Sequence, residues 1–168
     1  MTNNKERTIT LIRHAKSSWS DSSCPDFERP LNKRGIADAP KVGAALAEAG
    51  LGFDRILCSD ARRAQQTLSL LRQGIEIDEK ITEYRHDLYC ASANHLISCI
   101  SAQPSGIHHL VLIGHNPGME DLANTLAEQT IGSMPTCCVV HILFSCGDWP
   151  DLPMSEGNIG LMIRPRDL

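Results

Sequence analysis

The chain has 168 residues, of which 42% are hydrophobic and 21% charged, and this is enough to bury one hydrophobic core. Its formal net charge of −4 excludes an overall basic surface of the kind that collects nucleic acid or anionic membranes. No apolar run approaches the roughly 18 residues that a membrane span needs, and residues 1–7 lack the apolar core of a signal peptide. We therefore expect a single cytoplasmic domain over residues 1–168, with no nucleic-acid or membrane partner.

In the first half of the chain, short apolar runs alternate with stretches of helical periodicity. Polar segments rich in Pro, Ser and Asp separate them. In chain order we expect a strand at 9–12, a long surface loop at 17–30, a helix at 32–49 with a start or kink near Pro40, a strand at 54–59, and a helix at 61–72 that Ser59 or Asp60 caps. A loop as long as 17–30 tends to be functional.

The second half continues this alternation and ends in two strand-like runs. Its strongest strand pattern is 109–113, which leads directly into Gly114 and His115. The other expected elements are a weak strand at 75–77, helices at 92–102 and 119–128, and strands at 138–144 and 159–163. Alternating strands and helices predict a three-layer α/β/α fold, in which helices cover both faces of a mostly parallel sheet and the last two strands lie at its edge.

Chemically active side chains follow three of the expected strands. Arg13 and His14 follow the first strand. Ser59 ends the second, with Arg63 just beyond it, and His115 follows the strand at 109–113. The carboxyl ends of parallel strands meet at one edge of a sheet, so these side chains should share a pocket. Guanidinium groups and helix amino termini both bind phosphoryl oxygens, and the pocket is therefore predicted to bind phosphate.

The same residues predict a mechanism. Neighbouring cations disfavour the charged imidazole, so His14 should be neutral near pH 7 and able to attack phosphorus, forming a phosphohistidine intermediate. Arg13, Arg63 and His115 would stabilise the charge on the phosphoryl oxygens. This chemistry requires no cofactor or metal ion, and none is expected. The seven cysteines include no Cys-x-x-Cys pair and no Cys-x5-Arg loop of a thiol phosphatase, so we expect reduced thiols rather than a zinc site.

Three short motifs resemble the histidine phosphatase superfamily, which is also called phosphoglycerate mutase-like. The family pattern has an Arg-His signature after the first strand, then Ser-x-x-x-Arg-Ala-x-x-Thr, then Gly-His. These are matched in order by Leu11-Ile12-Arg13-His14-Ala15, by Ser59-Asp60-Ala61-Arg62-Arg63-Ala64-Gln65-Gln66-Thr67, and by Gly114-His115. The resemblance implies a phosphoglycerate mutase-like fold with His14 as nucleophile. It also assigns the phosphate-gripping role to Arg63 rather than Arg62.

Further motifs resemble the small SixA-type phosphohistidine phosphatases within that superfamily. They are Arg13-His14-Ala15-Lys16-Ser17-Ser18-Trp19, Arg29-Pro30-Leu31-Asn32-Lys33-Arg34-Gly35, Leu88-Tyr89, Gly114-His115-Asn116-Pro117-Gly118 and Met134-Pro135-Thr136. This resemblance implies hydrolysis of phosphohistidine on a protein partner such as a histidine phosphotransfer domain. We include Ser17 with Arg13, Arg63 and His115 among the expected phosphate-binding residues.

The chain departs from larger superfamily members in its expected proton donor. Those members carry a carboxylate after the second helix that protonates an alkoxide leaving group. Here that segment is short, and Glu83 and Asp87 are its candidates. Imidazole leaves more readily than an alkoxide, so a phosphohistidine substrate needs less help from an acid. Two alternatives stay open: hydrolysis of small phosphate monoesters with Glu83 or Asp87 as acid, and non-catalytic recognition of phosphorylated partners.

Several polar residues lie outside these hypotheses. Arg29, Lys33 and Arg34 form a basic cluster that either recruits an acidic or phosphorylated partner or is simply solvated. Five histidines lack partners at the spacing of metal ligands or catalytic triads, and we treat them as background: His86, His95, His108, His109 and His141.

Overall fold

The computed structural model describes residues 6–168. Its centre is a six-stranded sheet in the order β3-β2-β4-β1-β5-β6. The strands β1 to β4 run parallel to one another, whereas β5 runs antiparallel to β1 and β6. The strands are β1 (Glu6–Arg13), β2 (Arg55–Ser59), β3 (Thr82–Arg85), β4 (His109–Gly114), β5 (Val139–Ser145) and β6 (Gly157–Ile163). The last pair forms one side of the sheet, as predicted.

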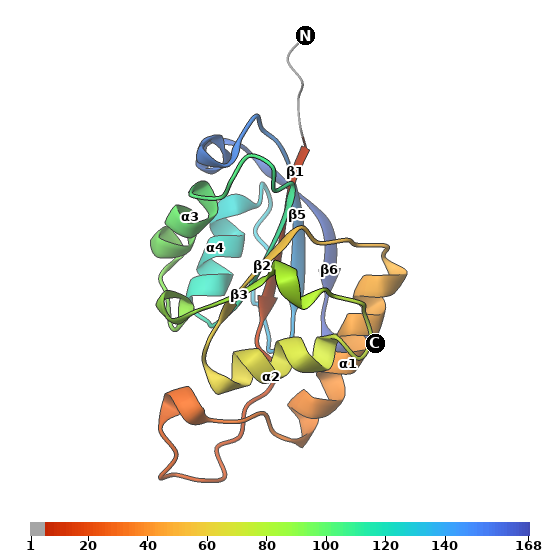
Figure 1. Ribbon diagram of the computed structural model, residues 1–168, viewed down its shortest axis with the longest axis vertical. Coiled ribbons are helices and arrows are strands. Elements are labelled where there is room, and N and C mark those ends of the chain that lie inside the picture. The colour runs from red at the N-terminus through yellow and green to blue at the C-terminus, as the bar shows by residue number, and fades with distance from the viewer. Residues whose placement is uncertain (1–5) are drawn as a thin grey trace.

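Helices cover both faces of this sheet (Figure 1). α1 (Lys33–Glu48) and α2 (Arg62–Leu71) pack together on one face, and α3 (Ala93–Ser101) and α4 (Gly118–Leu126) on the other. Short 3₁₀ helices complete the chain: η1 (Asp26–Glu28), η2 (Glu79–Ile81), η3 (His86–Leu88), η4 (Trp149–Met154) and η5 (Pro165–Asp167). The three-layer α/β/α prediction is confirmed. No helix in residues 6–168 combines the length and apolarity that crossing a membrane demands.

The strand β4 shows why its sequence is apolar throughout. Val111 and Ile113 pack against the α1 and α2 side, whereas Leu110 and Leu112 pack against the α3 and α4 side. Successive side chains of a strand point to opposite faces, and here both faces are covered by helices. A continuous apolar run is therefore the expected pattern for this central strand.

The predicted strand at 75–77 is wrong. Ile75 is buried in the core under α1 and α2, but its backbone belongs to no strand. The third strand is instead β3, which pairs with β2 at the opposite edge of the sheet from β6. Its four residues are half-buried or exposed, so they lack the apolar pattern that identifies a strand.

The helix α1 runs through Pro40 without ending there. The carbonyl that loses its usual partner belongs to Ile36, which lies on the exposed side of the helix where water can reach it. The helix begins after Asn32, whose side chain accepts from the N–H of Gly35 (2.9 Å). A Cβ at Gly35 would lie 2.3 Å from the carbonyl oxygen of Lys16. Glycine at this position therefore lets the first turn of α1 press directly on the loop that follows His14.

A buried histidine pair should make stability depend on pH. The Thr10 hydroxyl lies 2.8 Å from Nε2 of His109 and 2.9 Å from Nδ1 of His141. Burial and the adjacent His141 lower the pKa of His109 to about 4, and burial lowers the pKa of His141 as well. Below the ordinary histidine pKa, the unfolded chain binds protons that the folded chain does not, so stability is lost as pH falls from about 6.5 towards 4.

We expect His109 to account for up to about 3 kcal/mol of this loss, because each pKa unit corresponds to about 1.4 kcal/mol. Urea denaturation of the wild type and of His109→Gln between these pH values measures the effect. The variant should show a shallower decline, whereas His86→Gln, which changes an exposed histidine, should follow the wild type. Equal slopes for all three proteins would contradict the prediction.

Candidate active site

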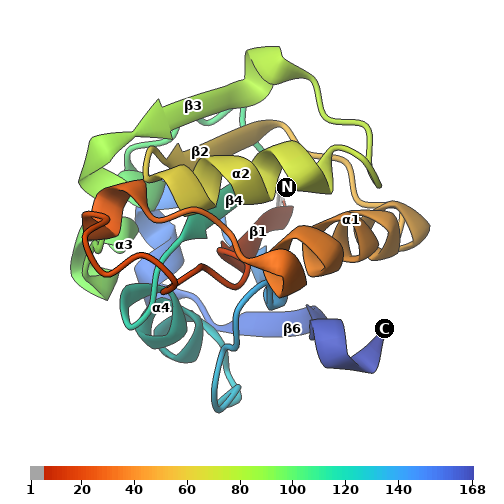
Figure 2. The same cartoon turned by 90° about the horizontal axis from the view of Figure 1, so that it is seen from below.

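The carboxyl ends of β1, β2 and β4 lie side by side, because β4 pairs in parallel with both other strands. His14 directly follows β1, and its backbone N–H donates to the carbonyl of Gly114 at the end of β4 (3.0 Å). The loop at 17–30 with η1 passes across this edge of the sheet, which Figure 2 shows from below. A pocket of about 280 Å³ lies here, lined by Arg13, His14, Lys16, Ser17, Trp19, Asp26, Arg29, Arg63, Cys90, His115, Asn116 and Thr136.

The tautomer of His14 is set by the backbone carbonyl of the next residue, Ala15. Its Nδ1 lies 2.7 Å from the carbonyl oxygen of Ala15. A carbonyl oxygen can only accept, so Nδ1 carries the proton and Nε2 keeps a free lone pair. In this structure the Nε–H of Arg63 donates to that lone pair across 3.3 Å. His14 therefore presents an unprotonated nitrogen to the cationic side of the pocket.

Burial keeps this imidazole uncharged. His14 is only 7% exposed. Its burial, reinforced by the Arg63 and Arg13 guanidiniums, lowers its pKa to about 4, although the hydrogen bond to Ala15 opposes the shift. The predominant form near neutral pH is the neutral ring, which is the form that can act as a nucleophile.

The two predicted arginines enter the pocket from different elements. Arg13, the last residue of β1, donates from Nη1 to the carbonyl of Met134 (3.0 Å). Arg63 lies in the first turn of α2 and is 3% exposed. Its two terminal nitrogens donate to Asp26, one to the backbone carbonyl (2.6 Å) and the other to the carboxylate (3.1 Å). The neighbouring Arg62 is exposed and does not line the pocket, so the fold brings Arg63 to His14 and leaves Arg62 outside.

His115 lies beside His14, with ring centroids 5.1 Å apart. Its Nε2 is 2.8 Å from the hydroxyl of Ser59, and its buried Nδ1 has no hydrogen-bond partner among residues 6–168. The Ser59 oxygen also accepts from the N–H of Ala61 (3.3 Å). Its hydroxyl can either donate to Nε2, which places the ring proton on Nδ1, or accept from Nε2. Burial and the proximity of His14 lower the pKa of His115 to about 3, so this ring is neutral too.

The expected cap of the α2 helix is wrong. The residue before the helix is Ala61, and no side chain caps the first turn. Ser59 bonds to His115 instead, as described above, and the carboxylate of Asp60 lies 3.1 Å from Nδ1 of His86. Both side chains are therefore used for contacts between segments, which local capping preferences do not predict.

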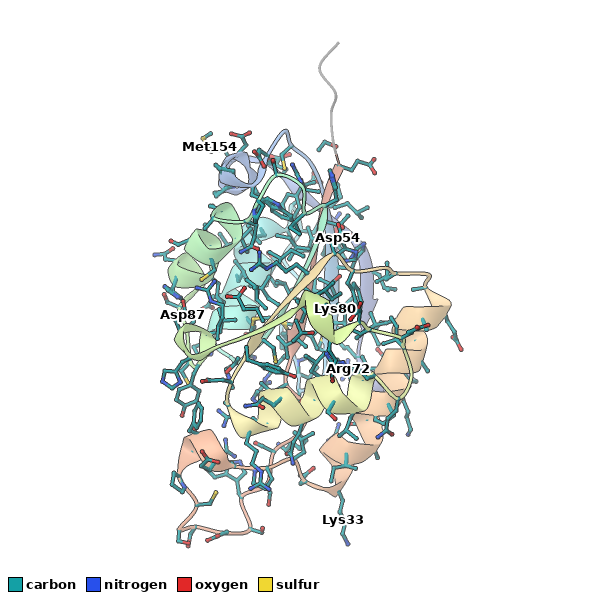
Figure 3. All side chains as sticks on the ribbon, in the orientation of Figure 1. Lys33, Asp54, Arg72, Lys80, Asp87 and Met154 are labelled. Carbon is teal, nitrogen blue, oxygen red and sulfur yellow. The ribbon has the colours of Figure 1, made fainter. Side chains whose placement is uncertain are left out.

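The predicted basic cluster is divided by the fold. Arg29 is buried in the pocket wall, where its Nη1 donates to the Ser17 hydroxyl (2.9 Å) and its guanidinium lies 3.5 Å from the ring centroid of Trp19. Lys33 and Arg34 lie at the exposed start of α1, and Lys33 points away from the fold (Figure 3). Ser17 and Arg29 are thus brought to His14, whereas Lys33 and Arg34 are not.

The sequence did not predict Asp26, the carboxylate of this pocket. Asp26, on η1, accepts from Arg63, from Nε of Arg29 (3.0 Å) and from the hydroxyl of Tyr89. The Tyr89 hydrogen bond, followed by Arg63 and Arg29, lowers the pKa of Asp26 to about 2 even though partial burial opposes the shift. Asp26 is therefore ionised. The length of the loop at 17–30 pointed to function, but nothing in its sequence distinguished Asp26 from Asp21.

Neither candidate proton donor reaches the pocket, and this corrects their assignment. Glu83 lies two residues before the end of β3 and pairs with Arg55 at the opposite end of β2. Asp87 lies beside α3 (Figure 3), where Arg85 donates to both of its oxygens (2.9 and 2.6 Å) and His95 lies 2.9 Å away. The register of the edge strand β3 directs Glu83 away from the phosphate-binding end of the sheet.

Comparison with known proteins places this site in a family context. A family model described as the histidine phosphatase superfamily (branch 1) matches residues 9–89, a range that includes His14 and Arg63 but not His115. An uncharacterized chloroplastic protein of Arabidopsis thaliana is 35% identical over 139 residues, which are 78% of this chain and 63% of that protein. An uncharacterized protein of Mycobacterium tuberculosis is 32% identical over 151 residues, which are 84% of this chain and 91% of that protein.

A solved structure extends the comparison to the whole fold. It is a chain from Agrobacterium tumefaciens that has been assigned as the phosphohistidine phosphatase SixA. The two chains are 25% identical and superpose with a TM-score of 0.77 over 95% of this chain and 99% of the other. The match therefore includes the segments after residue 89, on which His115 lies.

Proposed function

The chain belongs to the histidine phosphatase superfamily, and from this membership we propose that it is a phosphohistidine phosphatase, which removes the phosphoryl group from a histidine of a partner protein through a covalent intermediate on His14. The observation that carries the proposal is the state of His14. Its ring is neutral, its proton is fixed on Nδ1, and its Nε2 lone pair lies in a pocket that contains the guanidiniums of Arg13, Arg29 and Arg63.

In the first step, Nε2 of His14 attacks phosphorus as the phosphorus–nitrogen bond of the substrate breaks. The substrate imidazole leaves neutral when its other nitrogen carries a proton, so this step needs no external acid. Arg63 must release Nε2 before the attack, and its Nε–H is then free to bind a phosphoryl oxygen. When Ser59 donates to Nε2 of His115, the unpartnered Nδ1 of that ring carries the proton and can donate to the same phosphoryl group. These donors stabilise charge in the transition state, which is a main contribution of a protein to the catalysis of phosphoryl transfer.

In the second step, water attacks phosphorus and the bond to Nε2 breaks. His14 returns to the neutral ring, while inorganic phosphate and one proton are released. The Ala15 carbonyl keeps the Nδ1 proton in place throughout, so the same nitrogen serves in every turnover.

The substrate class follows from the carboxylates. Asp26 is the one carboxylate among the described residues that line the pocket. Arg63, Arg29 and Tyr89 keep it ionised, so it has no proton to give to an alkoxide. The alkoxide of a phosphate monoester would therefore leave slowly, whereas the imidazole of a phosphohistidine would not. This favours a phosphorylated protein over the small phosphate esters considered above.

A substrate panel tests this proposal. The wild type is assayed for phosphate release from a histidine-phosphorylated phosphotransfer domain, from an aryl phosphate and from a phosphoserine peptide. We expect the phosphoserine peptide to react at least roughly 10²-fold more slowly than the phosphohistidine protein, because a missing general acid typically costs this much. Comparable kcat/KM values for phosphoserine and phosphohistidine would overturn the substrate assignment.

Replacing Glu83 provides a separate check on the absent acid. Glu83→Gln should leave kcat/KM within about twofold for both phosphohistidine and aryl phosphate, because Glu83 lies outside the pocket. The variant loses its partly exposed ion pair with Arg55, which is expected to cost no more than about 1 kcal/mol of stability. Steady-state kinetics and thermal melting measure the two effects. A loss of about 10²-fold on the phosphoserine peptide, with phosphohistidine turnover unchanged, would restore Glu83 as the acid.

A further inference from the structure

Three side chains converge beside α3, outside the phosphate pocket. His95 and Cys99 lie four residues apart on this helix, so they share one face, and Asp87 approaches them from η3. Nε2 of His95 is 2.9 Å from Oδ2 of Asp87 and 3.5 Å from Sγ of Cys99, and the sulfur is 3.9 Å from the same carboxylate oxygen. One oxygen, one nitrogen and one sulfur therefore form a compact triangle.

The dimensions of this triangle come within about 0.4 Å of those around a tetrahedral zinc ion. Bonds of about 2.0 Å to oxygen and nitrogen and about 2.3 Å to sulfur place the ligand atoms roughly 3.3–3.6 Å apart. The observed separations of 2.9, 3.5 and 3.9 Å scatter about these values. From this geometry we infer that Asp87, His95 and Cys99 form a binding site for Zn²⁺, with three protein ligands and a fourth position open to solvent.

The surroundings hold two of the three ligand side chains in place. Arg85 donates to both oxygens of Asp87, at 2.9 and 2.6 Å, and its Nη2 also lies 3.6 Å from Sγ of Cys99. The guanidinium therefore orients the carboxylate, and its Nη2 has to move away from the sulfur when the ion binds. Ligating carboxylates are commonly hydrogen-bonded in this way. Cys99 is 4% exposed, whereas Asp87 and His95 are exposed, so the ion has an inner sulfur ligand and an open outer side. Carboxylate, imidazole and thiolate together give the donor set that zinc accepts.

Binding has a defined proton balance. The Cys99 thiol becomes a thiolate as its sulfur–metal bond forms, and its proton passes to solvent. In the metal-free protein Nε2 of His95 carries the proton that it donates to Asp87, so ligation through Nε2 requires the neutral ring to move this proton to Nδ1 by exchange with solvent. Thiolate and carboxylate together neutralise the two charges of the ion. Apparent affinity should therefore rise with pH, because the ligand proton competes with the metal.

His95 was treated as background because it was taken to lack a partner at metal-ligand or triad spacing, and the position of Cys99 corrects this. The signal that was available is His95 followed four residues later by Cys99 within a predicted helix. The third ligand could not be identified, since Asp87 precedes the helix and its direction depends on η3.

Metal titration tests the inference without any activity assay. The full chain, freed of metal, is titrated with Zn²⁺ in competition with a chromophoric chelator, and separately with Co²⁺ while absorption is recorded. We expect one tight equivalent of Zn²⁺ and, with Co²⁺, the intense near-ultraviolet band of a thiolate–cobalt bond together with the visible bands of tetrahedral cobalt. His95→Gln should weaken Zn²⁺ binding by at least roughly 100-fold, since loss of a ligand should cost more than the 10- to 100-fold known for outer contacts.

Matched variants separate this site from other thiols and imidazoles. His86→Gln alters an exposed histidine outside the triangle, and Cys90→Ser removes a thiol at the rim of the phosphate pocket. Both should keep the tight equivalent, whereas Cys99→Ser should lose the cobalt–thiolate band. Unchanged Zn²⁺ affinity in His95→Gln, or loss of the tight equivalent in His14→Ala or Cys90→Ser, would overturn the inference by placing the metal elsewhere.

Discussion

Replacing His14 with alanine should abolish dephosphorylation of a histidine-phosphorylated carrier protein. The expected loss in kcat is on the order of 10⁴-fold or more, because the variant lacks the atom that forms the covalent bond. The neighbouring guanidiniums would remain, so the variant should still bind phosphate. Initial rates of phosphate release measure the first effect, and competitive binding of inorganic phosphate measures the second.

A trapping experiment distinguishes the covalent route from direct hydrolysis. When the wild type is quenched during turnover of a carrier labelled on phosphorus, label should remain on the enzyme in a form that is labile to acid and stable to alkali. His14→Ala should carry none. Thermal melting verifies that the variant is folded, since His14 is buried. Turnover by His14→Ala at the rate of the wild type would refute the mechanism. If the wild type binds phosphate but turns over no substrate, a non-catalytic phosphate-binding module would be favoured.

Replacing Arg63 with lysine should give the second-largest loss. Arg63 donates its Nε–H to His14 while both terminal nitrogens donate to Asp26. One planar guanidinium group therefore links the nucleophile to the loop at 17–30. Lysine keeps the charge but cannot reproduce this planar arrangement. We expect kcat to fall by roughly 10²- to 10³-fold, the range seen when one donor to a developing oxyanion is removed.

The adjacent arginine provides a control of the same residue type. Arg62 lies on the exposed side of α2, so Arg62→Lys should leave kcat within about twofold of the wild type. Comparing kcat with KM adds a second test, because a residue that acts mainly in the transition state affects kcat more than KM. Equal effects of the two substitutions would mean that Arg63 does not contact the transferred group.

Elements with strong local patterns were predicted close to their observed bounds. The strand predicted at 109–113 is β4, His109–Gly114, and the helix predicted at 92–102 is α3, Ala93–Ser101. β3 was not predicted, because an edge strand that is largely half-buried has no apolar run to reveal it. Ile75 led to the opposite error, a predicted strand at 75–77 that does not exist, since a loop residue can be as buried as a strand residue.

The residues of the candidate site likewise include some that the local sequence predicted and some that it did not. The sequence identified His14, Arg63 and His115, because each lies within a few residues of the carboxyl end of a recognisable strand. The sequence did not identify Asp26 or its contact with Tyr89, because their meeting depends on the path of the loop at 17–30. Glu83 was assigned to the site from its position in the chain. In the structure it pairs with Leu57 in the middle of β2, and its side chain contacts Arg55 instead of the pocket.

Local sequence by itself therefore determined the alternation of strands and helices and the residues at the strand ends, because hydrophobic periodicity and turn residues report on neighbours along the chain. Only the tertiary structure decided the strand order, the burial that keeps His14 neutral, the ionised state of Asp26 and the convergence of Asp87 with His95 and Cys99. These features depend on contacts between segments far apart in sequence, and on the water that those contacts exclude, neither of which local periodicity records.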